Sequence, residues 1–135
     1  MTNQTFSNGY ALLIGIGADL PVTVQDATAL HNILIYPGKA AYSKEQVVLL
    51  TETSATRLKI LAAFDSLIEQ VSHNPEATVI VYYSGHGVKI NSPDGEKYFL
   101  VPYGFKMNNL EDTAISGKEF TEKIEAINAR NIMSG

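Results

Sequence analysis

The pattern of apolar positions along the chain predicts short buried strands. Three continuous apolar runs, each rich in aliphatic, β-branched or aromatic residues, are typical of strands that are covered on both faces in a parallel sheet. These runs cover residues 10–17, 46–50 and 77–83. The turn sequence Ser92–Gly95 predicts a further pair of strands, at residues 88–90 and 97–101, joined as a hairpin.

Between the apolar runs, apolar residues recur at helical spacing. One helix is predicted over residues 25–36, and a second carries an apolar stripe over residues 60–71, with Thr53 or Ser54 as its cap. The last helix has the clearest start, because Ser116 and Glu119 form a capping box. We expect that helix to end near Ala129.

This alternation predicts a single α/β domain over residues 1–135, with a mostly parallel sheet flanked by helices. Residues 130–135 resemble the approach to a further strand that the chain does not contain. A parallel α/β sheet normally continues with a strand after each helix. We therefore interpret the chain as a domain that is truncated at its C-terminal end.

Composition narrows the function classes. The 135 residues are 45% hydrophobic and 18% charged, which is typical of a globular domain. The formal net charge of −4 argues against nucleic-acid partners, and the lack of a long apolar run argues against a membrane span. With no signal-peptide pattern at the N-terminus, we expect a cytoplasmic location. The chain contains no cysteine, which excludes disulfides, thiolate metal sites and a thiol nucleophile supplied by these residues.

Two glycines after the first apolar run suggest one alternative, a nucleotide site. Gly15 and Gly17 could begin a dinucleotide-binding fingerprint, but Leu20 stands where the third glycine is needed. The simpler interpretation is that these glycines end a strand. A nucleotide-binding α/β domain therefore rests on fold analogy alone.

The strongest candidate site follows the strand at residues 77–83. Ser84, Gly85, His86 and Gly87 stand where an α/β sheet usually binds ligands, at the carboxyl end of a strand. The glycines are expected to let the backbone turn sharply and to leave the imidazole accessible for proton transfer. A serine nucleophile at Ser84 is disfavoured, because Tyr82 occupies a position that the nucleophile elbow reserves for glycine. The competing structural interpretation is a loop histidine that only bonds to backbone.

Four segments, in this order, resemble the large-subunit region of caspase-like cysteine peptidases, most closely the bacterial metacaspase and orthocaspase branch. They are Tyr10–Gly15, Val24–Ala27, Val79–Gly87 and Tyr98–Pro102. The resemblance implies a caspase/haemoglobinase-like α/β fold and a Cys–His dyad that cleaves peptide bonds in the complete protein.

The resemblance also assigns roles to individual residues. His86 matches the catalytic histidine, and Gly85 and Gly87 belong to the loop around the transition state. Asp26 matches the acidic residue that lines the S1 pocket in metacaspases and selects arginine or lysine, with Ser84 lining the same pocket. The alternative for Asp26 is a helix N-terminal acid that the helix dipole favours.

The departures from the family pattern set the remaining expectations. The family's cysteine follows the next strand, so we expect this chain to be inactive alone. No cofactor is expected; calcium is a minor alternative, since Ser116 and Gly117 occupy the place of the family's acidic pair and Asp94, Glu96, Glu111 and Asp112 lie nearby. The expected partners are a peptide or protein substrate and a homologous subunit or second copy. The alternative function is a non-catalytic caspase-like module that pairs with a homologue.

Overall fold

Four parallel strands form the central sheet of the computed structural model, which describes residues 5–17, 21–127 and 131–134. The strands are β1 (Gly9–Gly15), β2 (Val47–Thr51), β3 (Thr78–Ser84) and β7 (Asn131–Ser134), in the order β2-β1-β3-β7. Every residue of β1 is buried, as its continuous apolar sequence predicts for a central strand. The three predicted apolar runs are thus confirmed as neighbouring parallel strands.

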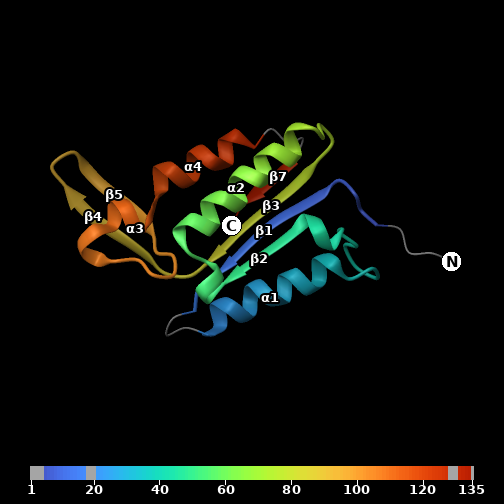
Figure 1. Ribbon diagram of the computed structural model, residues 1–135, viewed down its shortest axis with the longest axis horizontal. Helices are drawn as coiled ribbons and strands as arrows, with labels where there is room; N and C mark the ends of the chain where they lie inside the picture. The colour runs from blue at the N-terminus through green and yellow to red at the C-terminus, as the bar shows by residue number, and fades with distance from the viewer. Residues whose placement is uncertain (1–4, 18–20, 128–130, 135) are drawn as a thin grey trace.

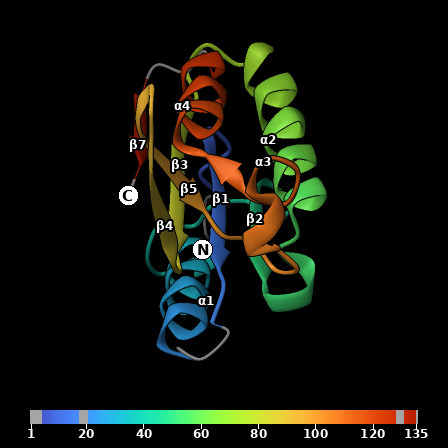
Figure 2. The same ribbon diagram turned by 90° about the vertical axis from the view of Figure 1, so that its left-hand side faces the viewer.

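Helices cover both faces of this sheet (Figures 1 and 2). On one face, α1 (Pro21–Ile35) packs its Leu34 against Ala11 and Leu13 of β1. On the other face lie α2 (Arg57–Ser72) and α4 (Gly117–Ala126), where Phe64 and Phe120 meet edge to face at 5.5 Å. This sandwich confirms the predicted α/β class with a parallel sheet flanked by helices.

The cap predicted for α2 is wrong. The helix begins at Arg57, and the Thr56 hydroxyl accepts the N–H of Lys59 at 3.3 Å. Ser54 is engaged elsewhere, because its hydroxyl accepts the N–H of Thr51 at 2.9 Å and donates to the Thr51 carbonyl at 2.7 Å. These bonds close a short 3₁₀ turn, Glu52–Ser54, which ends β2 before the helix starts.

The start of α4 is confirmed at Ser116, whose hydroxyl accepts the N–H of Glu119 at 3.0 Å. The Glu119 carboxylate completes a different interaction, a two-oxygen pair with Arg57 of α2 at 3.0 Å for each contact. The helix ends at Ala126, since Ile127 already has an extended backbone. The predicted end near Ala129 was therefore too late, and residues 128–130 themselves lie outside the described part.

The prediction that the chain contains no further strand is also wrong. β7 pairs with β3 in parallel register from Thr78↔Asn131 to Val81↔Ser134. Four residues were too few to show a strand by pattern alone, and the pairing with β3 supplies the backbone bonds that define it. The strand runs in the same direction as β3, toward the end of β3 that carries Ser84.

An antiparallel unit extends from the end of β3 (Figure 1). The predicted hairpin is confirmed as β4 (Gly87–Ser92) and β5 (Gly95–Leu100), and Gly95 takes the positive φ of 115° that its turn requires. A two-residue strand, β6 (Ile115–Ser116), pairs with β5. The short helix α3 (Leu110–Thr113) closes a small core around Phe99.

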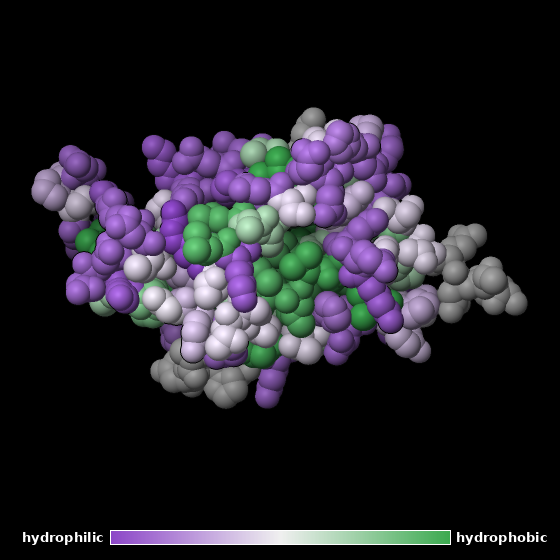
Figure 3. All heavy atoms as spheres, in the orientation of Figure 1, coloured by the Kyte–Doolittle hydropathy of each residue, from purple (hydrophilic) through white to green (hydrophobic). Residues whose placement is uncertain are grey.

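Apolar surface is exposed over β2 and the start of α2 (Figure 3), where Val48 is 37% and Leu58 80% exposed. In the described part of the chain, no helix combines the length and apolar character needed to cross a bilayer.

Candidate active site

The carboxyl ends of three neighbouring strands meet at one edge of the sheet. In the parallel register, Gly15 at the end of β1 pairs with Thr51 of β2 on one side and Ser84 of β3 on the other. The Ile16 N–H continues the ladder by donating to the Ser84 carbonyl at 3.0 Å. The residues that follow β3, including His86, therefore lie at the edge where α/β sheets bind ligands.

His86 has an exposed side chain on a firmly held backbone. Its carbonyl accepts the Tyr83 hydroxyl at 2.9 Å and the Val101 N–H at 3.3 Å. The same Tyr83 hydroxyl lies 3.3 Å from the Val101 carbonyl, so its single proton is shared between two acceptors. The backbone of the exposed residue His86 is thus tied to Val101, just after the end of β5.

Tyr83 can keep this role across the physiological pH range, because burial raises the pKa of its phenol to about 12. Side chains alternate along a strand, and Tyr82 and Tyr83 accordingly pack into separate core clusters on opposite faces of the sheet. The bond from Tyr83 to His86 was missed. A tyrosine three residues before a loop histidine was the one available signal.

Gly85 and Gly87 are needed for space rather than for an unusual backbone angle. The chain bends at Gly85 between β3 and β4, and neither glycine has a positive φ. A Cβ at Gly85 would lie 3.0 Å from the Tyr83 hydroxyl and 3.3 Å from the Ile16 carbonyl. A Cβ at Gly87 would overlap the Tyr98 hydroxyl. The glycines therefore let neighbouring groups close in around the His86 loop.

Ser84 and Asp26 occupy different layers near this edge. Ser84 is half-buried at the last position of β3, and Asp26 is an exposed residue of α1, the helix on one face of the sheet. Because α1 begins at Pro21, four residues before the predicted start, Asp26 is the sixth helical residue and lies beyond the first turn. The alternative of a helix N-terminal acid is therefore not supported. The structure brings Ser84 and His86 to one edge, with Asp26 in the second turn of a helix that starts there (Figure 1).

Glu52 is an additional residue at this edge that sequence reasoning missed. Its carboxylate accepts the N–H of the buried Gly17 at 2.5 Å, across 35 positions of sequence. Glu52 also has a positive φ of 48°, a strained backbone state for a residue other than glycine. It therefore anchors the chain where β1 ends. An acidic residue directly after a predicted parallel strand was the signal that could have identified it.

An apolar groove of ≈ 550 Å³ opens beside His86. At the sheet it is bounded by His86 and Ile16, and the segment that follows β5 forms its other wall. That wall includes Val101, Pro102, Tyr103, Phe105 and Met107. Among the described residues that line the groove, none is an Asp, Glu, Lys or Arg.

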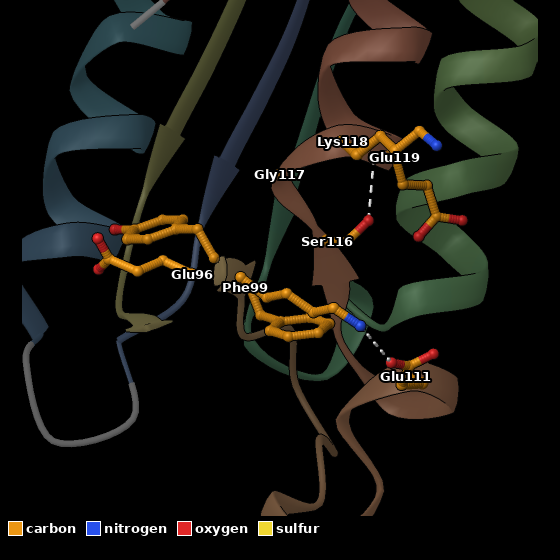
Figure 4. Close-up of a pocket in the computed structure, with 9 residues that line it drawn as sticks. Glu96, Phe99, Glu111, Ser116, Gly117, Lys118 and Glu119 are labelled. Carbon is orange, nitrogen blue, oxygen red and sulfur yellow. Dashed lines mark hydrogen bonds and ion pairs between the residues drawn. The ribbon is translucent and has the colours of Figure 1, made fainter. Parts of the chain in front are cut away.

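A second groove, of ≈ 620 Å³, lies between β5 and the start of α4 and has a charged lining (Figure 4). Its lysines include Lys97, which forms an ion pair with Glu111 at 3.5 Å. Glu96 lies at the opposite end of this groove from Glu111. Where the resemblance would place an acidic pair for calcium, Ser116 caps α4 and Gly117 is its first residue.

These residues do not fit a calcium site. Oxygen ligands must converge on the ion, and here the carboxylates of Glu96 and Glu111 lie apart, each already paired with a lysine ammonium group. Throughout residues 5–17, 21–127 and 131–134, no cluster of three or more His, Cys, Asp or Glu residues could hold a metal ion.

Comparison with known proteins decides the family. The model of the caspase domain, peptidase C14, matches residues 8–129, which is most of the chain. The chain belongs to the caspase-domain family. This is the family that the Val79–Gly87 segment indicated.

Two relatives add detail to this assignment. Metacaspase-1 of the fungus Eremothecium gossypii is 30% identical over 122 residues, which covers 78% of this chain and 26% of that protein. The chain thus spans about a quarter of the length of this relative. A crystal structure of a protein from Geobacter sulfurreducens superposes with a TM-score of 0.65 over 94% of this chain and 48% of the other, at 19% identity. That likeness confirms the caspase-like fold.

Proposed function

We propose that this caspase domain contributes the histidine of a Cys–His endopeptidase that cleaves peptide bonds after arginine or lysine. The observation that carries the proposal is His86, exposed at the carboxyl end of β3 with its backbone tied to Tyr83 and Val101. Membership of the caspase-domain family supports a peptidase. The chain has no cysteine, so the thiolate would come from a residue that these 135 do not include.

The sheet topology supports a thiolate on one particular side of His86. β7 is parallel to β3 and ends at Ser134 opposite Val81, so both strands point toward the edge that carries His86. In the proposed reaction, His86 accepts the thiol proton and the thiolate attacks the scissile carbonyl. The C–N bond then breaks as the imidazole returns the proton to the leaving amine, and water hydrolyses the acyl-enzyme.

Asp26 is proposed to select the residue before the scissile bond. Its carboxylate is exposed in the second turn of α1 and has no hydrogen bond or ion pair to another described residue. A carboxylate in this state can pair with the guanidinium or ammonium group of a substrate side chain. Ser84, half-buried at the edge, would line the same pocket.

The test is hydrolysis of arginine and lysine reporter peptides. Residues 1–135 alone should show no hydrolysis. The polypeptide encoded by the whole reading frame, which the proposal requires to supply the cysteine, should cleave both reporters and not a matched glutamate reporter. His86→Ala should abolish this activity, whereas His73→Ala, a matched histidine at the end of α2, should retain it. Activity that survives in His86→Ala would overturn the proposal.

One observation favours a second candidate, a non-catalytic module that pairs with a homologue. Within the described residues, β7 pairs on one side only, with β3, so its other edge offers free backbone groups to another chain. Sedimentation of residues 1–135 distinguishes the two functions. A dimer that binds a caspase-domain homologue while the whole reading frame shows no hydrolysis would favour the module.

A further inference from the structure

The apolar groove and β7 lie on opposite sides of His86. The groove is bounded by Ile16, which follows β1, and the sheet order β2-β1-β3-β7 places β1 on one side of β3 and β7 on the other. Ile16 belongs to the core cluster on the face covered by α2 and α4, whereas Asp26 is on α1, which covers the other face. His86 at the sheet edge therefore adjoins two distinct regions, the apolar groove on the face covered by α2 and α4 and the Asp26 region on the face covered by α1.

The segment that forms the wall of the groove is held at both ends by hydrogen bonds from its backbone N–H groups. The Tyr103 N–H donates to the Ala55 carbonyl at 2.9 Å, and the Lys106 N–H donates to the Thr113 hydroxyl at 2.8 Å. Between them the chain reverses at Gly104, whose φ of 87° suits glycine. The Val101 N–H also donates to the His86 carbonyl, so the wall is fixed in position relative to the histidine backbone.

The wall exposes apolar side chains to solvent. Tyr103 is 45%, Phe105 39% and Met107 62% exposed, while the adjoining Val101 is buried. Large apolar side chains gain free energy when a ligand removes them from water, and the groove has the size of a small-ligand site. Since none of the described lining residues is Asp, Glu, Lys or Arg, its complement is an apolar side chain and not an ionic one.

We propose that this groove binds a large apolar side chain of the substrate residue directly after the scissile bond. The physical reason is the direction of proton transfer. A histidine that protonates the leaving amine must lie beside that amine, so the leaving half of the peptide passes the imidazole on the side away from the thiolate. With the thiolate on the β7 side, that half reaches the apolar groove. The preferred substrates would be peptides with arginine or lysine followed by phenylalanine or leucine.

This inference rests on the proposed function for its choice of peptide, and it is tested by binding to residues 1–135. The probes are blocked tetrapeptides: Ala-Arg-Phe-Ala, Ala-Arg-Asp-Ala and Ala-Ser-Phe-Ala. Methyl NMR should show shifts at Ile16, Val88 and Met107 with the two phenylalanine peptides. Ala-Arg-Phe-Ala should bind about tenfold more tightly than Ala-Arg-Asp-Ala, as burial of one large apolar side chain implies.

Two variants and a control make the test specific. Met107→Glu and Phe105→Ala should each remove most of the preference for phenylalanine. Ile33→Glu, which changes an apolar residue 52% exposed on α1, should leave it unchanged. Equal affinity for the phenylalanine and aspartate peptides, shifts away from the groove, or an equal loss of preference in Ile33→Glu would overturn the inference.

Failure of the groove and failure of the proposed function give different results. If the polypeptide encoded by the whole reading frame cleaves arginine reporters while residues 1–135 bind the phenylalanine and aspartate peptides equally well, only the groove assignment is wrong. If phenylalanine peptides shift the groove methyls and no reporter is ever cleaved, the proposed peptidase is wrong and the groove is a site for apolar peptides.

Discussion

The two grooves of this molecule differ in lining more than in size. The apolar groove, ≈ 550 Å³, begins at His86, and none of its described lining residues is an Asp, Glu, Lys or Arg. The charged groove, ≈ 620 Å³, lies beside the start of α4, where Lys97 pairs with Glu111 and Glu119 pairs with Arg57. Both grooves use residues of the same β4–β5 unit and the segments that flank it.

Volume alone therefore does not distinguish the groove that we propose as a binding site from the charged groove. In the charged groove, Glu111 and Glu119 already have partners within the chain, so they offer a ligand little unpaired charge. In the apolar groove, exposed aromatic and aliphatic side chains adjoin an accessible histidine at the carboxyl edge of the sheet. A position at the carboxyl ends of the strands, together with exposed apolar side chains, is therefore a better indication of a binding site than groove volume.

The largest expected effect comes from the core that supports both grooves. Phe99 is 4% exposed and packs with Leu110 and Ala114 beneath the hairpin. Phe99→Ala should lower the free energy of unfolding by about 3 to 5 kcal/mol, because it leaves a cavity in this small core. Urea unfolding followed by circular dichroism measures the loss, and hydrogen exchange should show both grooves opening while β1 stays protected.

Tyr98→Ala is the matched control for that substitution. Tyr98 is the adjacent aromatic residue of β5 but is 54% exposed, so its truncation should cost much less. Equal destabilisation by the two substitutions would contradict the view that one buried ring supports both grooves.

An intermediate effect is expected at Tyr83, which affects the apolar groove alone. Tyr83→Phe removes the hydroxyl shared by the His86 and Val101 carbonyls, and should cost about 1 kcal/mol of stability. The Val101 amide should exchange faster, since the His86 loop is less firmly held. Tyr82→Phe, on the other sheet face, should change neither quantity; a similar effect there would show that the Tyr83 bond is unimportant.

The same variant has a defined pH dependence. Burial raises the pKa of Tyr83 from 10.0 to about 12, so at alkaline pH the unfolded chain loses this proton first. The contribution of Tyr83 to stability is therefore constant below about pH 10 and decreases as the pH rises toward about 12. Urea unfolding at about pH 9 and about pH 11 should show a smaller alkaline loss in Tyr83→Phe than in the wild type. Tyr42, whose pKa is also raised by burial, is present in both proteins and cancels in the comparison.

The smallest effect is expected in the charged groove. Lys97 and Glu111 are 49% and 76% exposed, so Lys97→Met should change stability by less than about 0.5 kcal/mol. Millimolar calcium should leave the melting temperature of both proteins unchanged, because their carboxylates do not converge. A calcium-dependent rise in melting temperature, measured by scanning fluorimetry, would show that this groove is a cation site.

Much of the fold could be predicted because local patterns and tertiary packing agree. The apolar run that became β1 is buried throughout, the run that became β3 alternates buried and half-buried residues over most of its length, and the Ser116 cap needs only a partner three residues away. The start of α1 at Pro21 was missed because the apolar stripe becomes clear only later in the helix. β7 was missed because its four residues depend on β3 for their hydrogen bonds.

The candidate site also has some features that could be predicted from the sequence and others that could not. A histidine between two glycines after an apolar strand was visible in the sequence, and the family model confirms the caspase-domain family that this motif helped to indicate. The bonds from Tyr83 to His86 and from Glu52 to Gly17 were not visible, since nothing in either residue's neighbours indicates its partner.

By itself, the sequence determined the α/β alternation, the position of His86 after a buried strand and the absence of a thiol from these residues. Those features depend on the order and spacing of side chains along the chain. Only the tertiary structure decided that the segment after β5 folds back onto Ala55 and makes an apolar wall beside the histidine. The groove combines this wall with Ile16 after β1, His86 after β3 and Val88 of the hairpin, and contacts between such distant segments depend on how the whole chain packs.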